Sequence, residues 1–253
     1  MTQIPTINMS DPTAVSELLV QAALVMETAQ GRIGSTQHIP ATGKILVTGD
    51  LHDNPFNYSK IVKLANLNKS EDNHLVLQEL IHGDKLIGGV DMSFRMLVRI
   101  ASLVVAYPKQ VHPIIANHEL SQLTRRGITK GKGNIVEMFI DGVEWVFGTE
   151  SERVLSAIDS FFLAMPLSIK SANGLMCCHS LPNAPLMHVF DKNIVNRPMT
   201  DADRNNVDGS ATLMVWGRVH TQTQVNMLAK EWDVKLFCLG HAFVPDGIEI
   251  LMP

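Results

Sequence analysis

The stretch ILVTGDLHDN, residues 45–54, joins an apolar run to a loop that carries acidic and imidazole side chains. Four strand-forming residues, Ile45 to Thr48, stop at a glycine, which predicts a buried strand that leads into a loop. Asp50 and His52 follow two positions apart, and in an extended segment such residues point the same way. We therefore expect a carboxylate and an imidazole to face one spot just beyond the end of the strand.

The composition indicates a medium-sized chain with room for a real core. Its 253 residues are 45% hydrophobic, which suits a single domain. With 21 Lys and Arg against 25 Asp and Glu, the net charge is −4, so we expect neither a nucleic-acid partner nor a membrane partner. The first residues lack a signal-peptide pattern, and no apolar run approaches the roughly 20 residues of a membrane span. Three cysteines are too few for a disulfide framework, so we expect a cytoplasmic protein.

The first 43 residues predict a helix followed by a linker. Asp11 and Pro12 suit the N-cap and the first position of a helix, and the apolar-rich run VSELLVQAALVM comes next. The stretch GRIGSTQHIPATG, residues 31–43, is typical of a linker. We expect residues 1–43 to form this N-terminal segment and residues 44–253 to form one main domain.

From residue 44 onward, strand and helix patterns alternate. Strands are expected at 45–48, 75–81 and 111–116, and helices near 57–67, near 91–107 and up to about residue 126. This rhythm predicts parallel strands flanked by helices. The glycine-punctuated residues 127–148 are expected to form an insertion or lid, and a helix is expected at 151–165.

The second half is richer in β-structure. Asn173-Gly174 between two short apolar runs predicts a hairpin with a type I′ turn. A long polar loop is expected from residue 181 to 211. After it, the pattern predicts a strand near 213–216, a helix near 222–232, a strand at 234–240 and a last strand near 247–251.

Metal-type ligands follow five of the expected strands: Asp50 and His52, Asp84, Asn117 and His118, His179, and His241. In open α/β sheets, ligands bind beyond the carboxyl ends of the strands, so these side chains can converge on one rim. Oxygen and imidazole donors without a thiolate suit two Mn, Fe or Zn ions. A shared carboxylate would hold such ions about 3.5–4 Å apart, the spacing used for phosphate-ester hydrolysis. We expect structural or solvent-facing roles for His74, His82, His112, His188 and His220, with His82 and His112 best placed to support the site.

The ordered set GDLHD, GD, NHE, H and GH resembles the motifs of the calcineurin-like metallophosphoesterases. The stretches ANHELSQLTRR, FFLAMPLSIKSANGLMCCHSLP and VNMLAKEWDVKLFCLGHAFVPDGIEIL are most similar to the phosphoprotein phosphatase branch, the serine/threonine phosphatases and their bacterial relatives. The resemblance covers residues 44–251. It implies a four-layer αββα sandwich of two mixed sheets, with residues 44–253 as the catalytic domain.

The resemblance also implies a role for each ligand by its position. Asp50 and His52 would hold the first metal, and Asp84 would bridge the two ions. The second metal would be held by Asn117, His179 and His241, with His118 as the general acid.

The chain departs from that branch in three places. GDKLIGG stands where the branch has Gly-Asp-x-Val-Asp-Arg-Gly, so Ile87 replaces the Asp that orients the catalytic His, and Gly88 replaces a phosphate-binding Arg. Arg125 and Arg218 are candidates to bind the substrate phosphate instead. Ala116 replaces the glycine before Asn-His and adds a methyl group there.

Three hypotheses about function stay open at this point. The first is a phosphomonoesterase that acts on substrates such as phosphoserine or phosphothreonine, with two divalent ions, preferably Mn, and a hydroxide that bridges them. The second is a dinucleoside polyphosphate or nucleotide hydrolase, in which Lys85, Lys130 and Lys132 would meet additional phosphates. The third is a catalytically weak metal-binding protein that recognises a partner through residues 127–148 and the polar loop. The complete ligand set argues against the third.

Overall fold

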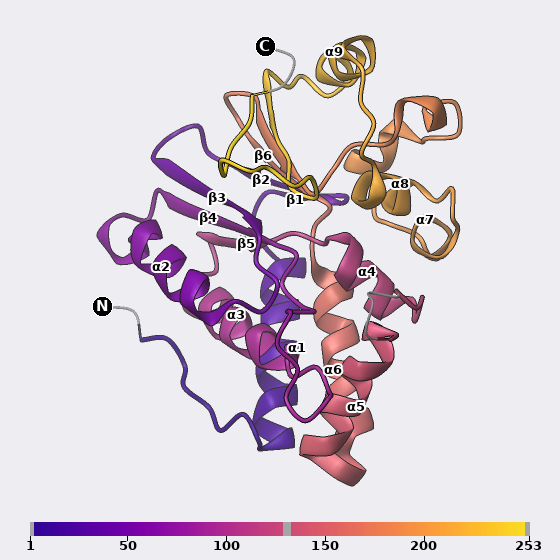
Figure 1. Cartoon of the computed structure of the whole chain (residues 1–253). Coiled ribbons are helices and arrows are strands. Elements are labelled where there is room, and N and C mark those ends of the chain that lie inside the picture. Colours follow the sequence, from indigo (N-terminus) through magenta and orange to yellow (C-terminus); the bar gives the residue numbers. More distant parts are fainter. Residues whose placement is uncertain (1–2, 129–132, 251–253) are drawn as a thin grey trace.

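Two β-sheets form the centre of the molecule, and helices lie on both sides of them (Figure 1). This computed structural model describes residues 3–128 and 133–250. Strands β3 (Lys44–Asp50), β4 (Asn73–Gln78) and β5 (Val111–Pro113) form a three-stranded parallel sheet. The other sheet has five strands in the order β1 (Arg32–Ile33), β2 (Thr36–Ile39), β6 (Ser168–Ser171), β7 (Leu175–Cys178) and β8 (Leu236–Cys238). Its neighbouring pairs are alternately antiparallel and parallel.

Strand β4 shows why the sheets pack as they do. Its side chains alternate in direction, so Leu75 and Leu77 join the large core beneath the helices while Val76 joins a smaller apolar layer between the two sheets. That layer consists of Ile39, Val76, Ile114, Ile169 and Cys177. Because both faces of β4 are covered, all six of its residues are buried. The sandwich of two sheets between helices that the sequence predicts is confirmed.

Helix α1 (Pro12–Glu27) packs against α3 (Phe94–Ala106) and α6 (Ser151–Ala164) on one side of the molecule (Figure 1). The predicted cap is confirmed, because the Asp11 carboxylate accepts hydrogen bonds from the backbone N–H groups of Thr13 and Ala14. Helices α2 (Pro55–Ala65) and α5 (Ile135–Phe147) lie on the same side. The predicted helix at the start of the chain is therefore part of the main core.

The linker predicted for residues 31–43 is wrong, because these residues contain the hairpin of β1 and β2. Gly31 and Gly34 have φ values of +89° and +56°, which lets the chain reverse direction. Strand β2 then lies parallel to β6, where the Thr36 and Ser168 hydroxyls are 2.9 Å apart. In the sequence these glycines suggest a linker, but in the structure they allow the turns of a β-hairpin.

The structure also revises three other local predictions. The hairpin at Asn173-Gly174 is confirmed, but only Gly174 has a positive φ, so the connection is a three-residue loop and not a type I′ turn. The strand predicted near 213–216 is a helix, α8 (Ser210–Trp216), in which residues 210–215 are buried. The strand predicted near 247–251 does not form over the described residues up to 250, where Ile248 and Ile250 are 79% and 81% exposed.

Residues 127–148 do not form a simple lid. They include α5, whose side chains Val136, Phe139 and Val143 are buried. The four residues 129–132, with Lys130 and Lys132, lie outside the described residues.

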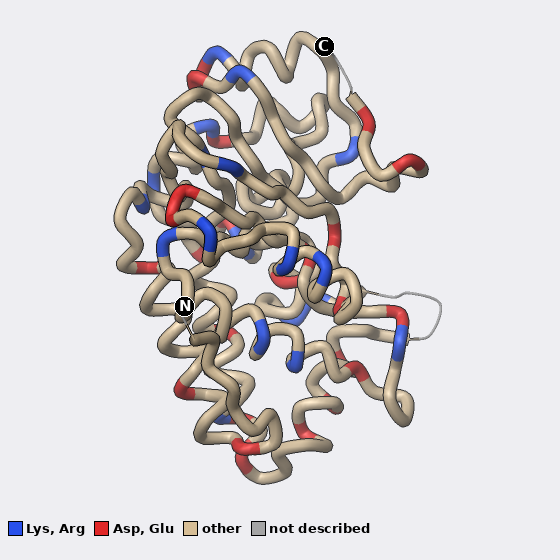
Figure 2. The backbone as a smooth tube through the Cα atoms, turned by 90° about the vertical axis from the view of Figure 1, so that its left-hand side faces the viewer, with Lys and Arg blue, Asp and Glu red and all other residues tan. Residues whose placement is uncertain are grey.

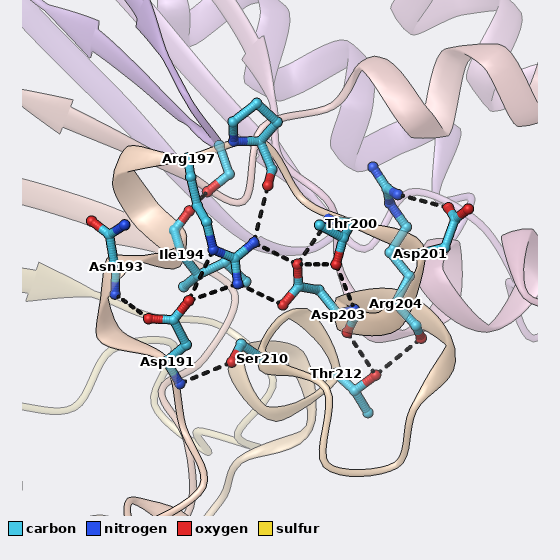
Figure 3. A network of polar contacts seen from close by, with 12 residues as sticks. Asp191, Asn193, Ile194, Arg197, Thr200, Asp201, Asp203, Arg204, Ser210 and Thr212 are labelled. Carbon is cyan, nitrogen blue, oxygen red and sulfur yellow. Dashed lines mark hydrogen bonds and ion pairs between the residues drawn. The ribbon is translucent and has the colours of Figure 1, made fainter.

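The predicted polar loop, residues 181–211, contains short helical segments: η3 (Ala184–Leu186), η4 (Lys192–Asn196), α7 (Asp201–Asn205) and the start of α8. An ion-pair network holds this segment together (Figure 3). The Arg197 guanidinium donates to both Asp191 and Asp203, and Asp203 also accepts hydrogen bonds from Thr200 (Figure 3). Beyond α8 the chain continues into α9 (Gln222–Glu231) and β8.

The charged residues are distributed over the molecule with both signs interspersed (Figure 2). This distribution agrees with the small net charge of −4. Among the residues that the structure describes, we find no helix with both the length and the apolar character that a membrane crossing requires.

Candidate metal centre

The exits of strands from both sheets meet at one place. The residues at or just after these exits are, in chain order, Asp50, His52, Glu79, Asn117, His118, His179 and His241. Within residues 3–128 and 133–250, five of these residues, without Asp50 and Asn117, form two groups, each compact enough to hold a cation, with the ligand atoms of a group within 4.8 Å of one another. One group is His52, Glu79 and His118, and the other is Glu79, His179 and His241. Glu79 belongs to both.

The Nε2 atom of His179 lies at the most crowded point of the site. It is 2.8 Å from Oε2 of Glu79, 2.7 Å from Oδ1 of Asn117 and 3.2 Å from Nδ1 of His241. The side chain of His179 is fully buried. Four ligand-type atoms therefore converge on a small buried volume.

The contact made by the other ring nitrogen of His179, Nδ1, determines which tautomer the ring adopts. Nδ1 lies 2.8 Å from Oε1 of Gln78, and the amide nitrogen of Gln78 donates to the backbone oxygen of Thr48, so Oε1 must face the ring as an acceptor. Nδ1 therefore carries a proton and donates it to Gln78.

Burial, offset in part by Asp50, lowers the pKa of His179 to about 4, so the ring is neutral near pH 7. Its Nε2 then presents a lone pair to two oxygens that also carry lone pairs, an arrangement that a cation between these atoms would stabilise. The donor set fits a divalent metal.

His241 completes this group from β8, the strand next to β7 in the same sheet. Its backbone N–H donates to Oδ1 of Asp50 over 3.2 Å, and its own Nε2 is buried without a hydrogen-bond partner among the described residues. Gly240 makes the approach possible, since a Cβ atom there would lie 2.7 Å from Oδ1 of Asp50 and 2.5 Å from Oε1 of Gln78. Burial, together with His179, lowers the pKa of His241 to about 3, which keeps it available as a neutral ligand.

The second group lies around the other oxygen of Glu79. His118 Nε2 is 3.2 Å from Oε1 of Glu79, and His52 Nε2 is 3.7 Å from the same oxygen. The two imidazole rings are 5.1 Å apart and meet edge to face. One carboxylate thus has an imidazole group near each of its two oxygens.

Beneath Glu79 lies a second buried acid, Glu119. Its Oε1 accepts hydrogen bonds from the backbone N–H groups of Leu80 and Ile81 over 2.7 and 3.2 Å. Burial and the nearby Glu79 raise the pKa of Glu119 to about 8. Glu119 therefore holds the loop after β4 without competing as a charged ligand near neutral pH.

The backbone at the site is unusual. His52, Asp53, Glu79, His82 and His241 all have φ values between +46° and +64°. Side chains with a Cβ seldom adopt this left-handed conformation, and where they do, it is often at functional sites. The five residues lie in the segments that follow β3, β4 and β8, where the chain changes direction.

The structure does not bring Asp84, the expected bridging residue, into either group. Asp84 is exposed, and Glu79 occupies the shared position instead. The cause is the length of β4, which ends at Gln78 and not at residue 81 as predicted. The carboxylate at the strand exit is therefore Glu79, five residues earlier.

Ile87 and Gly88, the two residues of this loop at which the chain departs from the phosphatase branch, also lie outside the two candidate metal groups. Ile87 is 50% exposed and forms an isolated β-bridge with Val90, and Gly88 lies against the ring of Trp145. Counting from Glu79, the position three residues on is His82, which is buried and paired with Asp91 at 2.7 Å.

The two candidate phosphate-binding arginines differ in their surroundings. Arg218 lies beside the site, with Nη1 donating to the backbone oxygen of His241 over 2.6 Å. The guanidinium of Arg125 pairs with Asp159 on α6 at 2.7 Å and with no residue of the two groups in the contacts described.

Sequence reasoning missed Glu79 and its neighbour Gln78. At the exit of β3, Asp50 is itself the residue at which the strand ends. The same offset selects Gln78-Glu79 only once β4 is known to end at Gln78, which the sequence pattern does not predict. The support that Gln78 gives to His179 spans 101 residues of sequence and has no local pattern.

Comparisons with known proteins extend these observations. A probable serine/threonine-protein phosphatase of Encephalitozoon cuniculi is 29% identical over 150 residues, which are 59% of this chain and 29% of that protein. The chain thus spans less than a third of that relative. Among solved structures, a protein serine/threonine phosphatase from Saccharomyces cerevisiae, described as similar to human phosphatase PP5, has a TM-score of 0.64 at 13% identity, over 92% of this chain and 72% of that one.

A cold-active protein-tyrosine phosphatase of a psychrophilic Shewanella species has a TM-score of 0.54 at 12% identity, over 87% of this chain and 70% of that one. At these identities the two solved structures show a shared fold. The model of the calcineurin-like phosphoesterase family matches residues 43–245, most of the chain and every strand exit at the site. The protein therefore belongs to the calcineurin-like phosphoesterase family.

Proposed function

We propose that this protein is a metal-dependent phosphomonoesterase whose two divalent cations share the carboxylate of Glu79. The observation that supports this proposal most strongly is the position of that carboxylate. It is buried, 2.8 Å from His179 on one side and 3.2 Å from His118 on the other. A single carboxylate between two sets of donors is how proteins hold two ions at the short spacing that phosphate-ester hydrolysis needs.

The proposed ligand roles combine the two groups with the positions that the family resemblance implies for Asp50, Asn117 and His118. Asp50, His52 and Glu79 would hold one cation, and Glu79, Asn117, His179 and His241 the other. Two such cations, with Mn as the proposed metal, would supply a bridging hydroxide near neutral pH and neutralise phosphoryl oxygens. Glu79 replaces Asp84 in this proposal.

The remaining residues of the site act on the substrate. His118 would donate a proton from Nε2 to the oxygen of the departing alcohol as the P–O bond breaks. Arg218 would contact a phosphoryl oxygen, because its guanidinium already lies beside His241. Arg125 is a weaker candidate for this contact because Asp159 already pairs with it.

Paired substitutions test the centre. In Glu79→Gln, which keeps the shape but removes the charge, we expect loss of bound metal and a fall of at least about 1000-fold in kcat on an aryl phosphate. The matched control is Asp84→Asn, an exposed carboxylate five residues away, which should retain both metal and turnover. The proposal fails if the control loses activity and Glu79→Gln keeps it.

Substrate class, partner and location stay predictions. A phosphorylated protein side chain and a nucleotide differ in the phosphates they would present, and the exposed Lys85 is the only described lysine among the three predicted to meet extra phosphates. A panel that compares phosphoserine and phosphothreonine peptides with dinucleoside polyphosphates would separate these substrates. We propose phosphomonoesters on proteins as the better substrates and the cytoplasm as the location.

A further inference from the structure

A buried histidine–aspartate pair lies directly behind His118. His82 and Asp91 are 3% and 2% exposed, and Nδ1 of His82 is 2.7 Å from Oδ2 of Asp91. The other oxygen of Asp91 accepts the backbone N–H of Ser93 over 2.8 Å, and the Ser93 hydroxyl accepts the backbone N–H of His82 over 3.1 Å. Both side chains are therefore fixed in orientation.

The Asp91 carboxylate decides which nitrogen of His82 carries the proton. A carboxylate only accepts hydrogen bonds, so the proton of His82 lies on Nδ1. Nε2 is then an acceptor, and it is buried without a hydrogen-bond partner among the described residues. Leaving such an atom unpaired in the interior is unfavourable because its hydrogen bonds to water are lost, so its presence needs an explanation.

The neighbours of the His82 ring narrow the explanation. The ring of Phe139 lies 5.6 Å away at right angles, and it offers no hydrogen bond. The ring of His118 lies 5.3 Å away and is tilted by 52°. At this separation a modest rotation of either imidazole brings a nitrogen of one ring to hydrogen-bond distance from a nitrogen of the other.

The backbone supports the same conclusion. His82 has a φ of +61°, a left-handed conformation that is strained for a residue with a Cβ. A purely space-filling side chain could occupy this buried position next to Phe139 without an aspartate behind it. The strained backbone, the fixed tautomer and the unpaired nitrogen together indicate that His82 forms a hydrogen bond that matters for function.

We infer that His82, held by Asp91, is a positioning residue that keeps the ring of His118 in the orientation from which it protonates the leaving group. This inference rests on the proposed function. After such a rotation, His82 Nε2 would accept a hydrogen bond from Nδ1–H of His118, and Nε2–H of His118 would face Glu79 and the substrate. His118 would then act as an imidazolium that is protonated on both nitrogens. When the bond from phosphorus to the leaving oxygen breaks, the Nε2 proton would move to that oxygen, and His118 would be left neutral with its Nδ1 proton in place.

The test uses two substrates that differ in how much they need an acid. The 4-nitrophenolate of 4-nitrophenyl phosphate leaves with little protonation, whereas the alcohol of a phosphoserine peptide leaves poorly without it. For the metal-loaded His82→Phe variant, we expect kcat to fall about 100-fold on the phosphoserine peptide and only a few-fold on 4-nitrophenyl phosphate, with KM unchanged. His82→Gln, whose side-chain amide restores an acceptor, should recover part of the loss.

An equal loss on both substrates would show a merely structural role for His82 and overturn the inference while the proposed function stands. Asp91→Asn serves as a second variant if His82→Phe does not fold, and the same selective loss is expected of it. Long-range ¹H–¹⁵N spectra of the Zn²⁺-loaded protein give a readout without turnover. They should show His82 protonated at Nδ1 and His118 protonated at Nδ1, with the His118 signals changed in His82→Phe. If the wild-type protein hydrolyses neither substrate, the proposed function fails, and unchanged His118 signals in the variant would refute the positioning role as well.

Discussion

Asp203 offers a quantitative test of how the polar loop is held. Its side chain is 8% exposed, and Oδ2 accepts hydrogen bonds from Arg197 Nη1 at 2.6 Å, from the Thr200 hydroxyl at 2.7 Å and from the Thr200 backbone at 2.8 Å. Burial alone would raise the pKa of Asp203, but the hydrogen bonds from Arg197 and Thr200 outweigh it and lower the pKa from 3.8 to about 2. A shift of this size corresponds to about 2 kcal/mol of folding free energy.

The sign of the pH dependence follows from that shift. Because the folded-state pKa lies below the unfolded-state value, the stabilisation is complete above about pH 5 and is lost as the pH falls toward 2. In urea unfolding at pH 7, we expect Asp203→Asn to lower the free energy of unfolding by about 2 kcal/mol. At pH 3 the difference from wild type should be roughly half as large.

A neighbouring carboxylate in the same helix provides the control. Asp201 is 91% exposed and contacts Arg204 at 3.3 Å, so Asp201→Asn should leave the free energy of unfolding nearly unchanged. The reasoning is refuted if the two variants lose equal stability at pH 7, or if the loss in Asp203→Asn is the same at pH 3.

Three further predictions concern the site. Gln78→Leu removes the acceptor for His179 Nδ1, so metal affinity should fall about 10- to 100-fold in a competition titration with a chelating dye, with little change in the fold by circular dichroism. Arg218→Ala should lower kcat/KM on an aryl phosphate by about 10-fold or more, whereas Arg125→Ala should change it less than about 3-fold; steady-state assays that show the reverse would transfer the phosphate contact to Arg125. Treatment with EDTA should lower the melting temperature, and Mn²⁺ at 100 times its Kd should restore about 2.7 kcal/mol of stability, as differential scanning calorimetry would measure; no change in melting temperature would mean that the donors gather without a cation.

The sequence predicts those parts of the fold that local patterns specify. The cap at Asp11, the alternation of strands and helices over residues 44–126 and the family itself depend on patterns of residues close together in the chain, and each is found as expected. The sequence also indicates the centre of the small sheet, because residues 75–77 of β4 are apolar on both faces and are typical of a buried strand.

The secondary-structure predictions fail where contacts between residues far apart in the sequence determine the structure. Residues 36–39 become a strand because β6, more than 130 residues later, provides their partner. The run at 213–216 is mistaken for a strand because a short apolar run by itself suits a buried helix as well as a strand, and residues 210–215 of this helix are all buried.

The candidate site follows the same division. The ligands at the exits of β3, β7 and β8 and at the start of α4 could be selected from their motifs, and the structure brings Asp50, His52, Asn117, His118, His179 and His241 together. Asp84 was selected in place of Glu79 because the end of β4 could not be located to within three residues. Ion ligation by any of these residues stays a prediction.

The left-handed backbone at five site residues has a consequence for the stability of the whole protein. His52, Glu79 and His241 each hold a conformation that a glycine would adopt without strain. Each such residue costs of order 1 kcal/mol, so together these conformations lower the folding stability by several kcal/mol while they orient the candidate ligand side chains. Selection for heat tolerance of the metal-free protein would therefore favour glycines at these three positions, but the same changes would remove the proposed ligands and with them the stability that a bound cation would add.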